Sequence, residues 1–211
     1  MSQDGQVQAY IEDLRKRLAI NPGCALTHYN LGVALVHQRK WHEAIVEFKE
    51  ALEQSPTMGE AYVNLGGIYM QLGDMDAAIE VNKKALEIRS EFAIPYGNLG
   101  YAYLMKGMLE EAVQMLRKAV SKDPEYIQAL SNLGSAYLQM GDLEESIACS
   151  KKALEIAPSF AFAHNNLAVA YLEKGDHTKA IEHFEKAAQL GYKVDPELVE
   201  ELSAYRESKG E

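Results

Sequence analysis

Asparagine side chains recur at one fixed interval along the chain. An interval of 34 positions separates Asn30, Asn64, Asn98, Asn132 and Asn166. An amide group both donates and accepts hydrogen bonds, so a row of amides could bind the backbone of an extended peptide without selecting its side chains. The same residues could instead order the helices that carry them, and the sequence leaves both roles open.

The sequence offers no set of residues that would converge on catalysis or metal binding. The histidines include neither a His-Glu-x-x-His motif nor a pair four residues apart, and they are His28, His37, His42, His164, His177 and His183. Cys24 and Cys149 form no Cys-x-x-Cys pair and are expected to be reduced structural thiols. No phosphate-binding GxxxxGK[ST] loop is present. We therefore predict a protein without catalytic residues, metal or cofactor.

The charge balance argues against nucleic acid as a partner. Lys and Arg number 21 against 31 Asp and Glu, a formal net charge of -10, and a field of this sign repels polyanions. Lysine pairs such as Lys83-Lys84 fall near the ends of expected helices, where cations match the helix dipole, so a solvated face explains them. The start of the chain lacks the apolar core of a secretory signal, and no apolar run is long enough to span a bilayer. These features predict a cytoplasmic protein without direct membrane insertion.

The asparagines belong to a longer pattern that covers most of the chain. Counting Ala25 as position 1 of a 34-residue period, position 7 is always leucine and position 27 is always alanine, as in Ala51, Ala85, Ala119, Ala153 and Ala187. Glycine recurs at position 15 as Gly73, Gly107, Gly141 and Gly175, and proline at position 32 as Pro56, Pro124 and Pro158. Apolar residues within each half recur at spacings of three and four. Each period therefore predicts two amphipathic helices.

Small and turn-forming residues should join these helices. Gly or Ala at positions 8, 20 and 27 would let neighbouring helices approach closely, while position 11 supplies bulk. The position-15 glycines are expected to end the first helices in a left-handed conformation. Asp74, Asp142 and Asp176 follow them and are expected to cap the second helices.

The combination of Leu-Gly, an aromatic residue, Gly-Asp, two alanines and proline at this spacing resembles the tetratricopeptide repeat (TPR) family. The resemblance covers residues 25–194. It implies an all-α fold, a right-handed TPR superhelix (an α-solenoid) of antiparallel helix pairs, with the first helices lining the concave side. The expected organisation is an N-terminal capping helix in 1–24, five repeats in 25–58, 59–92, 93–126, 127–160 and 161–194, and a C-terminal capping helix in 195–211.

Both ends have the apolar residues that a solenoid needs to cover its last repeats. Tyr10, Ile11, Leu14 and Leu18 resemble the second helix of a half repeat. At the other end Asp195-Pro196-Glu197 is a good helix start, and the helix would use Leu198, Val199, Leu202 and Tyr205 for packing.

Two departures from the family pattern stand inside the array. Position 24, often aromatic in the family, is Asn82 in repeat two and Ser150 in repeat four, which leaves the packing there in question. Pro95 in repeat three is tolerable only in the first turn of a helix. It is either a harmless first-turn proline or the mark of a hinge.

The resemblance implies that positions 2, 5, 6, 9, 12 and 13 of each first helix face the groove. The asparagines fill position 6, and around them stand mostly apolar residues: Leu26, Tyr29, Val33, Met70, Ile94, Tyr101, Leu104, Leu138, Phe162 and Val169. This composition favours an apolar or amphipathic segment of a partner protein. TPR domains that bind the acidic C-termini of heat-shock chaperones carry lysine at positions 2 and 5 and a basic residue at position 6. Here Tyr29, Val63 and Gly97 occupy position 5, so such chaperone tails are not expected partners.

Two functions fit this surface. The chain could be a scaffold or adaptor whose groove binds a segment of another protein. Alternatively, it could be a self-assembling homo-oligomeric scaffold that coats an organelle or a complex, as some bacterial TPR proteins do on magnetosomes. The N-terminal helix could correspondingly dock on repeat one of its own chain or in a neighbour's groove.

Overall fold

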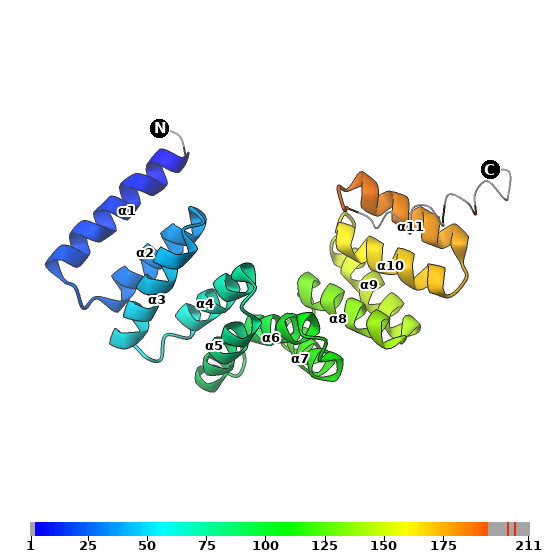
Figure 1. Ribbon diagram of the computed structural model, residues 1–211, viewed down its shortest axis with the longest axis horizontal. Helices are drawn as coiled ribbons and strands as arrows, with labels where there is room; N and C mark the ends of the chain where they lie inside the picture. The colour runs from blue at the N-terminus through cyan, green and yellow to red at the C-terminus, as the bar shows by residue number, and fades with distance from the viewer. Residues whose placement is uncertain (1–2, 194–201, 203–204, 206–211) are drawn as a thin grey trace. The chain divides into compact units, whose positions relative to one another are not determined.

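The computed structural model describes residues 3–193 together with Leu202 and Tyr205. These residues form helices and no strand, so the all-α class predicted from the period is confirmed. The helices, labelled in Figure 1, are α1 (Gln3–Ile20), α2 (Ala25–His37), α3 (Trp41–Gln54), α4 (Gly59–Leu72), α5 (Met75–Ile88), α6 (Ala93–Met105), α7 (Leu109–Lys122), α8 (Ile127–Met140), α9 (Leu143–Ile156), α10 (Ala161–Glu173) and α11 (His177–Gln189). None of these described helices combines the length and apolar character needed to cross a bilayer.

The helices form two compact units, residues 1–102 and residues 103–211, and the division falls inside α6. In the first unit α2 packs on α3 and α4 packs on α5, while α1 lies against α2 (Figure 1). In the second unit α8 packs on α9 and α10 packs on α11, while α7 lies against α8. Each pair is the helical hairpin expected from one 34-residue period.

Left-handed residues end the first helices of the repeats, as predicted. The φ angles of Gly73, Gly107, Gly141 and Gly175 are 80°, 71°, 81° and 75°, values that glycine adopts without steric cost. Repeat one has Arg39 at the equivalent position, with a φ of 56°. The backbone of this turn therefore holds Arg39 in a left-handed conformation that is unfavourable for residues with a Cβ atom.

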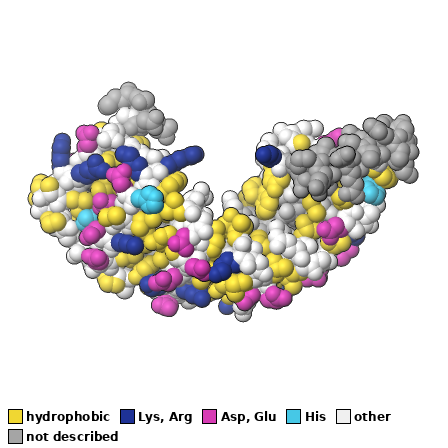
Figure 2. Space-filling view, in the orientation of Figure 1, with side chains coloured by type: hydrophobic (Ala, Val, Ile, Leu, Met, Phe, Trp, Pro, Cys, Tyr) yellow, Lys and Arg dark blue, Asp and Glu magenta, His cyan; other side chains and the backbone are white. Residues whose placement is uncertain are grey.

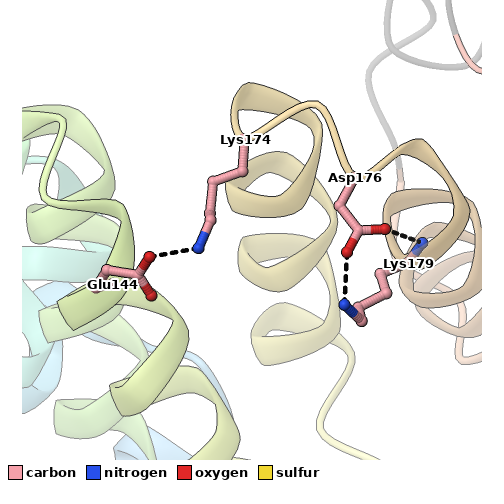
Figure 3. Close-up of polar contacts among 4 residues, drawn as sticks. All are labelled: Glu144, Lys174, Asp176 and Lys179. Atoms are coloured by element: carbon pink, nitrogen blue, oxygen red, sulfur yellow. Dashed lines mark hydrogen bonds and ion pairs between the residues drawn. The ribbon is translucent and has the colours of Figure 1, made fainter.

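The three predicted aspartate caps have two outcomes. Asp74 Oδ1 accepts a hydrogen bond from Ala77 N at 3.0 Å, and Asp176 Oδ1 accepts one from Lys179 N at 3.3 Å (Figure 3). Asp142 also occupies the N-cap position of α9, as predicted, but its side chain makes no capping hydrogen bond.

Two glutamates occupy the start of α9. Glu144 and Glu145 lie in its first turn, where their charge complements the helix dipole. Glu144 pairs with Lys174, which follows α10 (Figure 3). This ion pair links two neighbouring helices of the second unit.

The N-terminal helix α1 covers the first repeat of its own chain. Ile11 and Leu14 are fully buried and belong to the same core cluster as Leu31, Leu35 and Phe48, with Val7 and Leu18 packed at its edge. Its polar side bears charged groups such as Arg15, which pairs with Glu43 of α3 at 3.1 Å. Of the two docking places considered for this helix, the structure shows the one on repeat one.

The core of the second unit extends to the described residues near the C-terminus. Leu202 is buried in a cluster with Leu167 and Tyr171, and the ring of Tyr205 stacks on His177 with a centroid distance of 4.2 Å. The other residues predicted for this capping helix, from Asp195 to Val199, lie outside the described residues.

Glycine at position 8 allows the two helices of a repeat to touch. A Cβ atom on Gly32 would lie 2.8 Å from the ring of Phe48, the position-24 residue of the same repeat. On Gly134 it would lie 2.8 Å from Ser150 Oγ. Because real Cβ atoms do not approach so closely, these glycines are required by packing.

The polar residues at position 24 are fully buried. Asn82 donates to the Ala78 carbonyl at 2.8 Å and accepts from Asn98 Nδ2 at 3.0 Å. Ser150 Oγ, by contrast, has no hydrogen-bond partner among the described residues. The cost of burying a polar side chain at position 24 is therefore offset by hydrogen bonds for Asn82 but not for Ser150.

Pro95 is the third residue of α6 and its side chain is fully buried. In the first turn its missing N–H group breaks no helical hydrogen bond. The boundary between the two units lies farther along the same helix, between Ala102 and Tyr103. The hinge interpretation of this proline stays a prediction.

Candidate functional site

The first unit contains a pocket of about 390 Å³ between its first helices. Residues of α2, α4 and α6 line it together with the first residue of α3, and they are Val36, Trp41, Val63, Asn64, Gly67, Ile68, Gln71, Ile94 and Asn98. Most of these stand at the positions expected to face the groove. The pocket volume lies toward the lower end of the range of about 300–1,000 Å³ typical of ligand sites.

The lining is apolar with an amide component, and it includes no charged side chain. Ile94 is 51% exposed, and Leu26, which holds the same position in the first repeat, is 61% exposed. Covering such side chains with a partner would contribute favourable free energy to binding. Figure 2 shows hydrophobic side chains reaching the surface among the charged ones.

The asparagines of the position-6 column have different surroundings. Asn64 Nδ2 donates to the Glu60 carbonyl at 2.8 Å and to the Tyr29 hydroxyl at 3.4 Å. Asn98 Nδ2 donates to Asn82 Oδ1 at 3.0 Å, and both Asn64 and Asn98 line the pocket. In these two residues the amide nitrogen is already bonded within the chain.

In the second unit, Asn166 is only 2% exposed, and its Nδ2 donates to the Ser131 carbonyl of α8 at 2.9 Å. This bond joins the first helices of adjacent repeats. Asn30 and Asn132 are half-buried. The column thus contains at least one residue that orders neighbouring helices, while peptide binding by the others stays a prediction.

The apolar residues predicted for the groove are spread over both units. Ile94 joins Asn64 and Asn98 in the pocket, and Leu104 is mostly buried. Leu26 is exposed, and the other predicted side chains are half-buried: Tyr29, Val33, Met70, Tyr101, Leu138, Phe162 and Val169. None of these seven lines the pocket.

Sequence reasoning missed Trp41 and Gly67 as site residues. Trp41 begins a second helix, outside the columns assigned to the groove, although it is the only tryptophan of the chain. Gly67 occupies position 9, where the other repeats have Val33, Tyr101, Ser135 and Val169. The glycine at a position that carries a side chain in every other repeat was the feature of the sequence that could have indicated the pocket.

The two position-4 histidines are held as structural rings. His28 Nε2 donates to the Pro22 carbonyl at 2.8 Å, and its Nδ1 lies 2.7 Å from Glu47 Oε2. Burial alone would lower the pKa of His28, but the bonds to Glu47 and Pro22 outweigh it and raise that pKa. The site stabilises an imidazolium.

His164 makes the equivalent bond with Nε2 to the Pro158 carbonyl at 3.1 Å, but its Nδ1 lies 3.0 Å from Nδ1 of His183. A neutral His164 that donates through Nε2 accepts at Nδ1, so His183 is the donor. Burial and the neighbouring His164 both lower the pKa of His183. The lowered pKa favours the neutral form of His183.

The cysteines differ in their surroundings. Burial raises the pKa of the Cys149 thiol to about 11, which favours the unreactive protonated form. The Thr27 hydroxyl donates to Cys24 Sγ at 3.0 Å, and this bond lowers the pKa of Cys24. Within the part of the chain that the structure describes, no three His, Cys, Asp or Glu side chains are grouped as metal ligands.

Paired helices stacked by small residues, with a pocket on the first helices, define a helical-repeat binding protein. One family model described as tetratricopeptide repeat matches residues 57–125 and 125–191, and a second with the same description matches residues 25–58. The chain belongs to the tetratricopeptide repeat family, and its fold is a TPR solenoid. Comparison with curated protein sequences gave no match.

Solved structures show the same fold. A crystal structure of MamA is 28% identical, covers 79% of this chain and 91% of its own, and gives a TM-score of 0.69. MamA of Desulfovibrio magneticus is 26% identical, with coverages of 79% and 94% and a TM-score of 0.70. YrrB, described as a TPR protein with an unusual peptide-binding site, is 23% identical, with coverages of 92% and 99% and a TM-score of 0.72.

Proposed function

We propose that this protein is a non-enzymatic scaffold or adaptor that binds an apolar or amphipathic segment of a partner protein along its first helices. The pocket between α2, α4 and α6 carries the proposal, because its wall is uncharged and largely apolar and includes the exposed side chain of Ile94. Its lining offers no cation for a nucleic-acid phosphate or for the acidic tail of a heat-shock chaperone. The expected setting is the cytoplasm.

Affinity capture with groove variants tests this function. Leu26→Asp and Ile94→Asp place a charge on the proposed surface, where a bound apolar segment would desolvate it. Val46→Asp is the matched control, because Val46 is also exposed, at 56%, but lies on the second helix α3 outside the pocket. We expect partners captured from an extract of the source cells to be lost with both groove variants and retained with the control. Equal capture by all three variants would exclude the groove.

Self-assembly is a second candidate function, favoured by Ile20 at the end of α1, which is 85% exposed. Removing the whole helix would uncover Ile11 and Leu14, so truncation would confuse assembly with loss of the core. Ile20→Asp leaves that core intact. If copies associate through this end, light scattering should show a concentration-dependent mass for the wild type that falls to the monomer mass in the variant. A monomer mass for both at high concentration would reject self-assembly.

A further inference from the structure

The helix α1 has one side that the rest of the first unit leaves open. It packs on α2 through Ile11 and Leu14 (Figure 1). It also has the register of a second helix, because Pro22 stands 34 positions before Pro56. In every complete repeat the second helix packs on a first helix of the same repeat, but the described residues include no such helix for α1.

The residues on this open side differ from those of the complete repeats. Positions 20 and 27 are Tyr10, which is 46% exposed, and Arg17, whose side chain is 64% exposed. In the five repeats these positions hold small residues without exposed surface, namely Ala44, Ala78, Ala112, Ser146 and Ala180 at position 20 and Ala51, Ala85, Ala119, Ala153 and Ala187 at position 27. Because Tyr10 and Arg17 are bulky, no helix can approach α1 as closely as the helices of a repeat approach one another. This side therefore fits a helix at a wider spacing, whose side chains interdigitate with its own.

Four exposed side chains form a stripe along this side, which we call the α1 stripe. Tyr10, Asp13, Arg17 and Ile20 follow one another at spacings of three, four and three residues, so they lie on one face of the helix. Arg17 Nη2 lies 2.7 Å from Asp13 Oδ2, and both side chains are at least half exposed. An exposed ion pair of this kind contributes little to stability. The stripe thus has two apolar ends and an exposed pair of opposite charges between them.

The α1 stripe is complementary to itself when two copies run in opposite directions. Spacings of three and four residues let the side chains of two antiparallel helices alternate along their contact. Read backwards, the stripe runs Ile20, Arg17, Asp13 and Tyr10. An antiparallel second copy therefore sets each aspartate against an arginine and each tyrosine against an isoleucine. A parallel copy would set Asp13 against Asp13, which like-charge repulsion disfavours.

We propose that α1 binds α1 of a second copy of this chain in antiparallel orientation, with Tyr10 against Ile20 and Asp13 against Arg17 across the contact. This proposal rests on the second candidate function, self-assembly, and assigns the surface that performs it. A two-fold contact uses the same surface on both copies, so assembly closes at a dimer. Each dimer carries two of the pockets described above and could bind two segments of one partner with increased avidity.

The contact is small, which sets the expected affinity. The stripe extends over 10–20, a length of about 16 Å at 1.5 Å per residue, and such a helix pair lies below the roughly 1,200–2,000 Å² of a standard interface. We expect a dissociation constant on the order of 100 µM. Sedimentation equilibrium of the full chain from about 10 µM to about 1 mM covers this range. The mass should rise with concentration from that of the monomer toward that of the dimer.

Charge reversal tests the pairing across the contact. Asp13→Arg leaves two arginines in the stripe, and Arg17→Asp leaves two aspartates. Each variant alone should associate more than tenfold more weakly than the wild type, because like charges then face each other. An equimolar mixture of the two variants should dimerise again, since every arginine of one copy faces an aspartate of the other. The double variant with both substitutions should dimerise like the wild type for the same reason.

Glu80→Lys is the matched control. Glu80 forms an exposed ion pair with Lys84 four residues later on the second helix α5, at 2.7 Å, so this substitution breaks the same kind of pair outside the stripe. Its mass at each concentration should equal that of the wild type. Far-UV circular dichroism and urea midpoints should agree among all these variants, because the changed side chains are exposed.

The outcomes separate this contact from self-assembly in general. A wild type that stays monomeric up to about 1 mM, well above the expected dissociation constant, rejects both. Self-association that survives both charge reversals, or a mixture that stays monomeric, rejects the α1 contact and leaves self-assembly through another surface. Assemblies larger than a dimer also reject it, because a two-fold contact cannot extend.

Discussion

Alanine should have opposite effects at the two neighbouring glycines of α4. In Gly66→Ala the new Cβ meets Asn82, which cannot move aside freely because it is fully buried and holds bonds to Ala78 and Asn98. Overpacking costs about 1–3 kcal/mol and a displaced hydrogen bond about 1 kcal/mol, while helix propensity returns about 1 kcal/mol. We expect the free energy of unfolding of the first unit to fall by about 1–3 kcal/mol.

The same substitution at Gly67 meets open space. Only the helix-propensity gain remains, so Gly67→Ala should raise the free energy of unfolding by about 0.5–1 kcal/mol. Each variant is thus the control for the other, since both change one glycine to alanine in the same helix.

Urea unfolding followed by Trp41 fluorescence, with far-UV circular dichroism as a second probe, measures these changes in the first unit. The two midpoints should move in opposite directions without a change in slope. Adding Asn82→Ala to Gly66→Ala removes the obstacle, so the double variant should be more stable than the sum of the single effects. Equal midpoints for the two glycine variants, or strict additivity in the double variant, would refute the packing argument.

Four further substitutions test local features. Arg39→Gly relieves a left-handed residue and should raise the urea midpoint by an amount equivalent to about 0.5–1 kcal/mol; a lower midpoint would show that the arginine side chain outweighs the strain. Ser150→Ala removes a buried hydroxyl without a partner among the described residues and should stabilise the second unit by about 1 kcal/mol in thermal unfolding, whereas destabilisation would reveal a hydrogen bond. His183 has a lowered pKa, so its contribution to stability is present above the unfolded value of about 6.5 and lost as the pH falls through the folded pKa. His183→Gln should flatten that acid loss. The raised pKa of His28 has the opposite sign, with stability present below about 6.5 and lost as the pH rises through the folded pKa, and His28→Gln should flatten that loss instead. Unfolding midpoints measured from pH 5 to 8 separate the two, and unchanged profiles in the variants would contradict both assignments.

The periodic sequence was sufficient to predict the helix pairs. A 34-residue period with small residues at fixed positions has few packing solutions, since only helices that approach closely can bury the bulky residues between them. Turns also depend on adjacent residues in the sequence. The left-handed conformation of Gly73 and the capping bond of Asp74 could therefore be predicted from the residues beside them. Asp142 stands at the same position of its repeat and makes no side-chain capping bond, so the position alone does not determine the bond.

The roles of the asparagines depended on the tertiary structure. Asn98 faces a polar residue, Asn82, where repeat one has Phe48, and Asn166 reaches the carbonyl of Ser131 on the preceding first helix. Identical residues at one position of the period therefore make different bonds. Their partners come from another helix or repeat, which the spacing alone does not identify.

The pocket likewise depended on contacts between distant parts of the sequence. The period by itself determined which helix faces carry apolar side chains, because that pattern is set within each helix. Only the tertiary structure brought Val36, Trp41 and Ile94 to the space left by Gly67. A cavity is bounded by the side chains around it. Here those side chains belong to three repeats, and they meet only when the helices are stacked.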